Sequence, residues 1–219
     1  MFENIKQDYN RSNYLKKKEQ KATLPRILFR SFQDSGFRAV FFFRIGRWCR
    51  DRHLGLLAAF FERLMRHWSH CWVSTLAKIG PGFVIAHVCG IIIPPDVVFG
   101  KNCIIRQNTT LGGNYDNRSD EGRTNPWIGD NVSIGPGAAI LGPIRIGSNS
   151  IIGANALVTK SVPENSVVGA FRAEIVAKRA NDGGIIRDNQ KQLLSRHEIS
   201  EKISALEKRI QELEKRTTS

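Results

Sequence analysis

The sequence feature that most restricts the fold of this chain is a repeat with a period of six residues. In "WIGDNVSIGPGAAILGPIRIGSNSIIGANALV", residues 127–158, an aliphatic side chain recurs at every sixth position. Neither the period of about 3.6 residues of a helix nor the period of about two of a single strand produces this spacing. It is typical of a parallel β-helix, in which short strands stack coil upon coil. The recurring residues are Ile128, Ile134, Ile140, Ile146, Ile152 and Val158.

The first half of the repeat is less regular. Ile79 and Ile85 keep the spacing of six, but Ile93 and Phe99 continue it with the phase shifted by two residues. The shift falls in "CGIIIPP", immediately after His87. A second interruption, the polar segment 113–126, has no periodicity and is expected to leave the coil as a loop. Loops that project from a regular scaffold often carry binding residues.

The two ends of the chain are expected to be helical. From Leu24 to about residue 72, apolar residues and arginines alternate at helical spacing, and "FRAVFFFRIGRW" and "LGLLAAFFERLMRHW" predict two amphipathic helices. From about residue 191, a heptad pattern predicts a coiled-coil-like helix for self-association, or alternatively a helix packed on its own domain. We therefore expect three regions: basic helices over 1–72, a β-helix over 73–177 and a linker with the C-terminal helix over 178–219.

Charge and composition narrow the function classes. The net charge is +13, and residues 1–72 carry +9 of it, from 15 Lys/Arg against 6 Asp/Glu. The basic, aromatic segment 24–72 favours peripheral contact with an anionic membrane, although its aromatic side chains could equally pack on the protein itself. No element that reads bases accompanies the charge, so we expect no nucleic acid partner. The polar N-terminus, the absence of an apolar run of about 18 residues and the four dispersed cysteines predict a cytoplasmic protein.

The chain resembles the left-handed β-helix acyltransferases that are built from hexapeptide repeats. The segments "IGPGFVIAHVCGIII", "RQNTTLGG" and "IGPGAAILGPIRIG" are most similar to the serine acetyltransferase branch, and the similarity covers roughly residues 34–178. This resemblance implies a homotrimer that binds acetyl-CoA between neighbouring subunits and uses no metal.

The resemblance assigns the catalytic base to His87. A neutral imidazole can take the proton from an attacking hydroxyl, which is a poor nucleophile on its own, and return it to the departing thiolate of coenzyme A. The backbone N–H of Gly113 is the expected donor to the oxyanion, because a glycine lets the backbone approach the substrate closely. The alternative for His87 is a buried imidazole that only completes a hydrogen bond in the core.

Small residues at coil corners are the expected contacts of acetyl-CoA, and two basic residues are expected near its phosphates. The same glycine and alanine positions are also favoured by tight corners, so a purely structural role stays open for them. The expected cofactor-binding residues are Gly113, Pro136, Gly137, Ala154, Lys160 and Arg172.

Three departures from the serine acetyltransferase pattern bear on the acceptor. Ala86 and Trp72 stand where the family has aspartates, and Asn125 replaces a second histidine. An ammonium group pairs with carboxylates, so losing them weakens the reason to prefer serine. We therefore expect a saccharide acceptor, of capsule, exopolysaccharide or lipopolysaccharide biosynthesis, held by Asn125, Trp127 and Gln107.

Other interpretations remain at this point. The same fold could serve as a serine acetyltransferase with a rebuilt pocket, or as a scaffold without catalytic activity. The cluster His67, His70 and Cys71 could also hold a metal ion, although such a group on an arginine-rich helix is more often a polar face.

Overall fold

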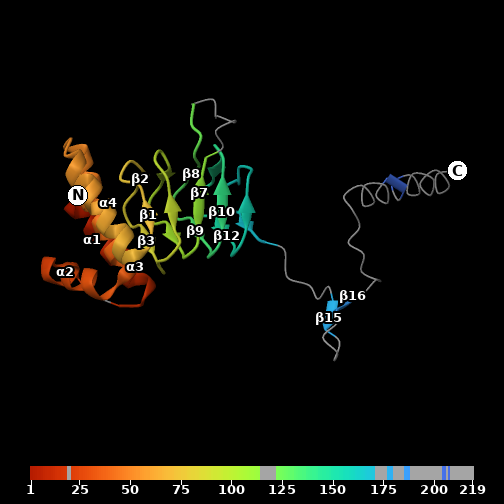
Figure 1. Cartoon of the computed structure of the whole chain (residues 1–219), viewed down its shortest axis with the longest axis horizontal. Helices are drawn as coiled ribbons and strands as arrows, with labels where there is room; N and C mark the ends of the chain where they lie inside the picture. The colour runs from red at the N-terminus through yellow and green to blue at the C-terminus, as the bar shows by residue number, and fades with distance from the viewer. Residues whose placement is uncertain are drawn as a thin grey trace. The chain divides into compact units, whose positions relative to one another are not determined.

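A computed structural model describes residues 1–18, 21–113 and 122–170, and also the backbone of 177–179 and 185–187 and the residues Ser204, Ala205 and Glu207 (Figure 1). The chain divides into two compact units, Met1–Phe171 and Arg172–Ser219. The second unit holds an antiparallel pair of strands, β15 (Ala177–Arg179) and β16 (Ile185–Arg187). The predicted C-terminal coiled-coil helix lies outside the described residues, except for Ser204, Ala205 and Glu207, which are helical.

Four helices precede the repeats and form what we call the helical cap: α1 (Phe2–Leu15), α2 (Leu24–Gln33), α3 (Ser35–Asp51) and α4 (Gly55–Ser69). The two predicted amphipathic helices correspond to α3 and α4. The Asp34 side chain caps α3 by accepting a hydrogen bond from the Phe37 N–H at 3.1 Å, and Pro25 lies in the first turn of α2, where its missing N–H costs nothing. Helix α1 lies within the region 1–72 that was expected to be helical, but its bounds were not predicted.

The repeats form the expected left-handed parallel β-helix, a solenoid of about four turns made of three parallel sheets. The first sheet stacks β1 (Trp72–Val73), β4 (Ile92–Ile93), β7 (Thr110–Gly112), β10 (Ala139–Leu141) and β13 (Leu157–Val158). The second stacks β2 (Lys78–Ile79), β5 (Val98–Phe99), β8 (Trp127–Ile128) and β11 (Arg145–Ile146). The third stacks β3 (Val84–Ile85), β6 (Ile104–Ile105), β9 (Ser133–Ile134), β12 (Ile151–Ile152) and β14 (Val167–Val168).

The aliphatic residues of the six-residue repeat fill the interior of the prism. Each has at most 5% of its surface exposed, whereas Ile151, the residue before Ile152 in β12, is 49% exposed. Corners between the sheets are made by residues with positive φ, mostly asparagines, which tolerate the left-handed backbone conformation. Along one edge, the amide of Asn131 donates to Asn149, and the amide of Asn149 donates to Asn165. The repeat read from the sequence is therefore the core of the domain.

The predicted phase shift is a longer corner. Strands β3 and β4 begin at Val84 and Ile92, eight residues apart, where the regular repeat would place them six apart. The two extra residues are taken up near Cys89 and Gly90, whose φ angles are 94° and 63°. His87 lies in this enlarged corner.

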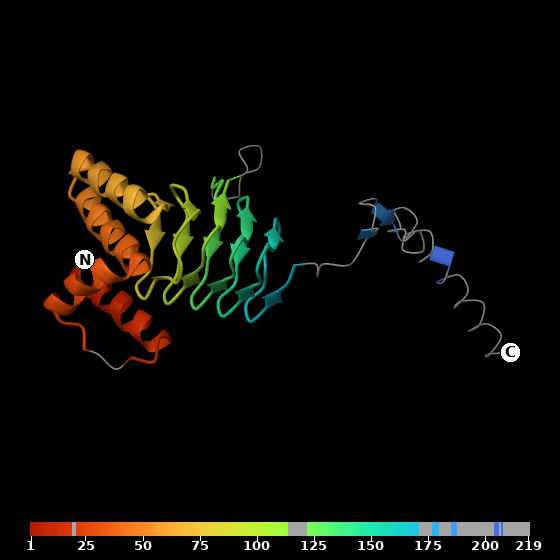
Figure 2. The same cartoon turned by 60° about the horizontal axis from the view of Figure 1, so that its bottom comes forward.

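The helical cap covers the N-terminal end of the prism, as both views of the ribbon show (Figure 2). Arg44 of α3 donates to both carboxylate oxygens of Asp8 in α1, at 2.8 and 3.0 Å, and to the carbonyls of Ile79 and Gly80 in the first coil. Asp8 also accepts from the Phe83 N–H at 2.8 Å. Burial raises the pKa of the Asp8 carboxyl, and its bonds to Arg44 and Phe83 act against that rise.

A glycine lets the cap approach the β-helix closely. A Cβ on Gly36 of α3 would lie 2.0 Å from the Ile85 carbonyl oxygen, which is shorter than any contact between real atoms of these types. The start of α3 therefore rests against the strand that leads into His87. In the described part of the chain, no helix is both long enough and apolar enough to cross a bilayer.

Candidate active site

One edge of the prism gathers five of the ten residues predicted to act on the substrate and the cofactor. It is formed by the corners that follow β3, β6, β9 and β12, and we call it the His87 edge. Backbone hydrogen bonds stack these corners: Asn108 N–H to Cys89 O at 2.8 Å, Gly137 N–H to Gln107 O at 3.0 Å, and Asn155 N–H to Pro136 O at 2.9 Å. The predicted site residues on this edge are His87, Gln107, Pro136, Gly137 and Ala154.

The His87 edge is long enough to hold an extended ligand. Parallel strands are spaced by about 4.8 Å, so the three steps from the corner of His87 to the corner of Ala154 span about 14 Å. Gly137 has a φ of 71°, and a Cβ there would lie 2.1 Å from the Asn155 side-chain oxygen. The coil itself therefore requires this glycine, and the same lack of a side chain leaves the backbone of the corner open.

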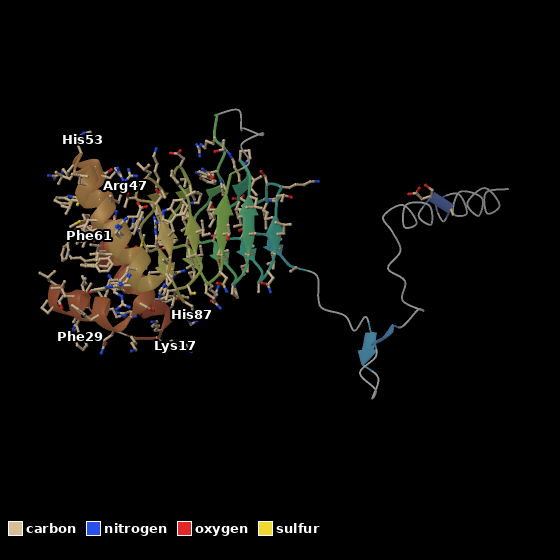
Figure 3. All side chains as sticks on the ribbon, in the orientation of Figure 1. Lys17, Phe29, Arg47, His53, Phe61 and His87 are labelled. Carbon is tan, nitrogen blue, oxygen red and sulfur yellow. The ribbon has the colours of Figure 1, made fainter. Side chains whose placement is uncertain are left out.

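His87 is exposed to solvent. It lies where the first coil meets the helical cap (Figure 3). Among the described residues, no side-chain or backbone group forms a hydrogen bond or ion pair with its imidazole. The alternative of a buried, satisfied histidine is therefore excluded. A catalytic imidazole needs a partner that selects its tautomer, and within the described part of one protomer His87 lacks it.

Gln107 lies one coil beyond His87 on the same edge, and its Oε1 atom is buried without a hydrogen-bond partner among the described groups. Buried polar oxygens in proteins are nearly always satisfied, so an unpaired one indicates a missing partner. A ligand or a neighbouring subunit would supply that partner. Gln107 thus indicates that the edge is incomplete as it stands.

Of the other predicted residues, Gly113, Asn125 and Lys160 lie on another edge, between the first and second sheets, which we call the Asn125 edge, and Trp127 lies next to it in β8. The Asn125 amide donates to the Pro95 carbonyl at 2.8 Å, and its Oδ1 atom is buried and unpaired among the described groups. A Cβ on Gly113 would lie 3.0 Å from that Oδ1. The Trp127 ring lies 5.8 Å from the Arg145 guanidinium, and Lys160 is exposed at a later corner of this edge.

Within one protomer the two edges do not meet. The first sheet separates them, and the six residues from Gln107 to Gly113 span up to about 20 Å of extended chain. His87 can therefore share a site with Gly113 and Asn125 only if the two edges come from different copies of the chain. Arg172 lies outside the described residues, as does the part of the predicted loop from 114 to 121.

Sequence reasoning missed one carboxylate that lies beside Trp72. Glu62 of α4 accepts hydrogen bonds from the Trp72 indole N–H at 2.9 Å, and from the Thr75 N–H and hydroxyl at 3.1 and 3.0 Å. Trp72 stands where the resemblance expects an aspartate, so an acidic group is still present beside that position. It comes from the cap and is distant in sequence, which is why no motif reveals it.

Residues 125–160 match the family model described as bacterial transferase hexapeptide (six repeats). The serine acetyltransferase of Mycobacterium tuberculosis is 34% identical over 161 residues, which cover 74% of this chain and 69% of that protein. The chain belongs to the serine acetyltransferase family. The serine acetyltransferase of Synechococcus elongatus is 30% identical over 64% of this chain, which spans only 57% of that relative's length.

Solved members of the serine acetyltransferase family have the same fold. The Brucella abortus enzyme in complex with coenzyme A aligns with a TM-score of 0.58 at 30% identity, covering 65% of this chain and 56% of that one. The Neisseria gonorrhoeae enzyme in complex with serine aligns with a TM-score of 0.57 at 35% identity, covering 64% and 56%. The expected resemblance to this branch is therefore confirmed.

The expectation of a saccharide acceptor is wrong. The relatives and solved structures that the chain matches are serine acetyltransferases, not enzymes of polysaccharide pathways. The expectation took Asn125, Trp127 and Gln107 to hold a sugar, and took the loss of aspartates at Ala86 and Trp72 as a reason against serine. In the structure, Trp72 is bonded to Glu62 and Asn125 to the Pro95 carbonyl, so both side chains already serve the fold.

The structure gives no support for a metal centre. No group of three or more His, Cys, Asp or Glu side chains is arranged for a metal ion within the ranges that the structure describes. In the cluster singled out in the sequence, Cys71 is buried, and its thiol donates to the Ser69 carbonyl at 3.1 Å. Burial also raises the pKa of this thiol, which disfavours the thiolate that binds metals.

Proposed function

We propose that this protein transfers the acetyl group of acetyl-CoA to the hydroxyl of serine, with His87 as the general base. The observation that carries the proposal is the position of His87: an exposed imidazole with no partner among the described residues, at the start of an edge about 14 Å long whose corners are small. The solved relatives that contain coenzyme A and serine support both ligands.

The reaction needs only one proton carrier. His87 takes the proton from the serine hydroxyl as the oxygen attacks the thioester carbonyl, and a tetrahedral oxyanion forms. The C–S bond then breaks, and the proton passes from the imidazolium to the thiolate of coenzyme A. Such a base contributes a factor of about 10²–10⁴ to the rate.

The proposed site is shared between subunits of a homotrimer. Placing the His87 edge of one copy against the Asn125 edge of the next brings together groups that one protomer keeps apart. The Gly113 N–H would then stabilise the oxyanion, Asn125, Trp127 and Gln107 would line the acceptor side, and Lys160 and Arg172 would meet the phosphates of coenzyme A. The unpaired oxygens of Gln107 and Asn125, one on each edge, support this arrangement.

We also propose that the protein works in the cytoplasm. Its four cysteines are free thiols, and three of them are buried in the fold. Burial raises the pKa of the Cys103 thiol to about 11, so this group stays protonated and unreactive at neutral pH. Free thiols are the usual state in reducing compartments.

Thiol release from acetyl-CoA tests the function directly. The full chain is assayed with L-serine, with a panel of sugars and without acceptor. We expect release that depends on serine and falls on dilution as the trimer dissociates, with the mass followed by light scattering. Turnover with a sugar but not with serine would contradict the proposal, and no turnover with any acceptor would favour a scaffold.

A further inference from the structure

The outer face of α2 is apolar and uncovered. Leu24, Leu28, Phe29 and Phe32 recur at helical spacing, and their exposed fractions are 54%, 43%, 64% and 74%. The opposite face of the same helix holds the buried Ile27. Two largely exposed phenylalanines on one short helix are more than the scattered apolar residues of an ordinary surface. This face therefore calls for a partner outside the protomer.

A cluster of lysines lies directly before this helix. Lys6, Lys17, Lys18 and Lys21 line a hollow of about 900 Å³ between α1 and the start of α2. Residues 1–33 contain eight Lys/Arg and three Asp/Glu. One of the acids, Asp8, is paired with Arg44 inside the protein, and Glu3 lies 3.6 Å from Lys6. The hollow therefore presents an excess of positive charge on α1 and on the segment that leads into α2.

The structure also shows which aromatic residues of the predicted membrane segment 24–72 are free for such a contact. Phe37 and Phe43 of α3 are 4% and 1% exposed, because they form the core of the cap. They can contribute nothing to an outer surface. Leu56 and Phe60 of α4 are also exposed, but the lysine-lined hollow leads into α2, so we place the expected contact at α2, whose Phe29 is labelled in Figure 3.

The positive charge of the lysine cluster indicates which kind of partner binds the α2 face. If two copies of the chain met through α2, their lysine clusters would be brought together, and like charges at short range repel. An anionic bilayer instead offers phosphates to the lysines and acyl chains to the phenylalanines, which is how amphipathic helices lie in a membrane interface.

We propose that α2 and the lysine-lined hollow form a docking surface for anionic phospholipid bilayers. Phe29 and Phe32 enter the boundary between headgroups and acyl chains, and Lys18 and Lys21 contact the phosphates. The protein is thereby held at the membrane surface without crossing it. This inference does not depend on which acceptor the enzyme uses.

Vesicle co-sedimentation of the full chain tests the proposal. Vesicles of equal parts phosphatidylglycerol and phosphatidylcholine are compared with vesicles of phosphatidylcholine alone. We expect binding to the anionic vesicles only, weakened by salt. Since each lysine at an anionic surface is worth about 1 kcal/mol, K18Q/K21Q should weaken binding roughly 30-fold. K78Q/K101Q removes the same charge from exposed positions on the β-helix and should leave binding within about twofold.

A second test variant, with its own control, examines the apolar half of the docking surface. F29S/F32S should weaken binding at least about tenfold, because both rings lose their apolar environment. L56S/F60S changes two residues of α4 that are 92% and 53% exposed, and should leave binding unchanged. Unfolding temperatures confirm that all four double variants are folded.

Four results would overturn the proposal. The first is equal binding to neutral and anionic vesicles, and the second is equal losses in a test variant and its control. The third is self-association without vesicles that F29S/F32S abolishes, which would make the α2 face a contact between copies. Capture of an acidic protein with no vesicle binding would likewise replace the lipid as the partner.

Discussion

The helical cap and the β-helix are stabilised in different ways. The interior of the β-helix is built from repeated aliphatic residues, and each coil offers the next the same backbone pairing. Among the described residues, the buried charged side chains, Asp8, Arg30 and Arg44, all belong to the cap. Repetition distributes stability over many equivalent contacts, whereas the cap depends on a few specific ones. The two regions should therefore respond differently to single substitutions.

The largest expected effect is on catalysis, and it should leave the stability of the β-helix unchanged. His87→Ala should lower kcat by about 10²–10⁴-fold while the unfolding temperature stays unchanged, because the side chain is a solvent-exposed base. Steady-state kinetics and thermal unfolding measure the two effects. His53→Ala, at an exposed position between α3 and α4, is the control and should keep full activity. An active His87→Ala enzyme would contradict the assignment.

The next effect is expected in the cap. Asp8→Asn leaves the Arg44 guanidinium buried without its counter-charge, which typically costs about 3–5 kcal/mol of the free energy of unfolding. Glu3→Gln removes an exposed partner of Lys6 and should cost no more than about 0.5 kcal/mol. Urea denaturation of both variants gives the comparison. Equal costs would show that the buried pair does not hold the cap to the first coil.

A substitution within one coil of the β-helix should change the free energy of unfolding less. Ile152→Val removes one methylene from the packed interior and should cost about 0.5–1.5 kcal/mol. Ile151→Val makes the same change on the outer side of the same strand, where the side chain is 49% exposed, and should cost less than about 0.5 kcal/mol. The two variants are compared by denaturation as trimers and as dissociated chains. A loss at Ile151 found only in the trimer would place that face at a subunit contact.

The smallest expected effect depends on pH. Burial works against ionisation of Asp34, but Lys16, the Phe37 N–H and Arg30 outweigh it, so the pKa of this carboxyl is lowered from 3.8. The stabilisation from this lowered pKa is complete above pH 3.8 and is lost as the pH falls through the lower, folded-state value. Asp34→Asn, which keeps a capping side chain, should therefore flatten the loss of stability below about pH 4. Denaturation curves from pH 5 to about pH 2 test this, and parallel curves for the two proteins would contradict it.

Periodic features of the sequence predicted the β-helix well. The aliphatic column, the two-residue shift after His87 and the helices α3 and α4 can all be recognised from local spacing, because each of these elements repeats a short pattern. Helix α1 has no such pattern. It is held by Asp8, whose partners Arg44 and Phe83 lie 36 and 75 residues away in the sequence.

The site was predicted in part for the same reason. Stacking of corners follows from the repeat, so His87, Gln107 and Ala154 could be expected on one edge. The hydrogen bond between Glu62 and Trp72 joins the cap to the first coil, and no spacing rule indicates it. Without that contact, Trp72 was interpreted only as the loss of an aspartate, and this loss contributed to the mistaken sugar acceptor.

His87 lies in the first coil of the β-helix and therefore marks one end of the His87 edge. The cap closes this end, whereas β14, the last strand of the third sheet, exposes 76% of Val167. Each coil beyond His87 adds about 4.8 Å to the edge. In the proposed site, the number of coils between His87 and Ala154 sets the length of the edge available to the acyl donor, and inserting or deleting one coil would change that length by about 4.8 Å.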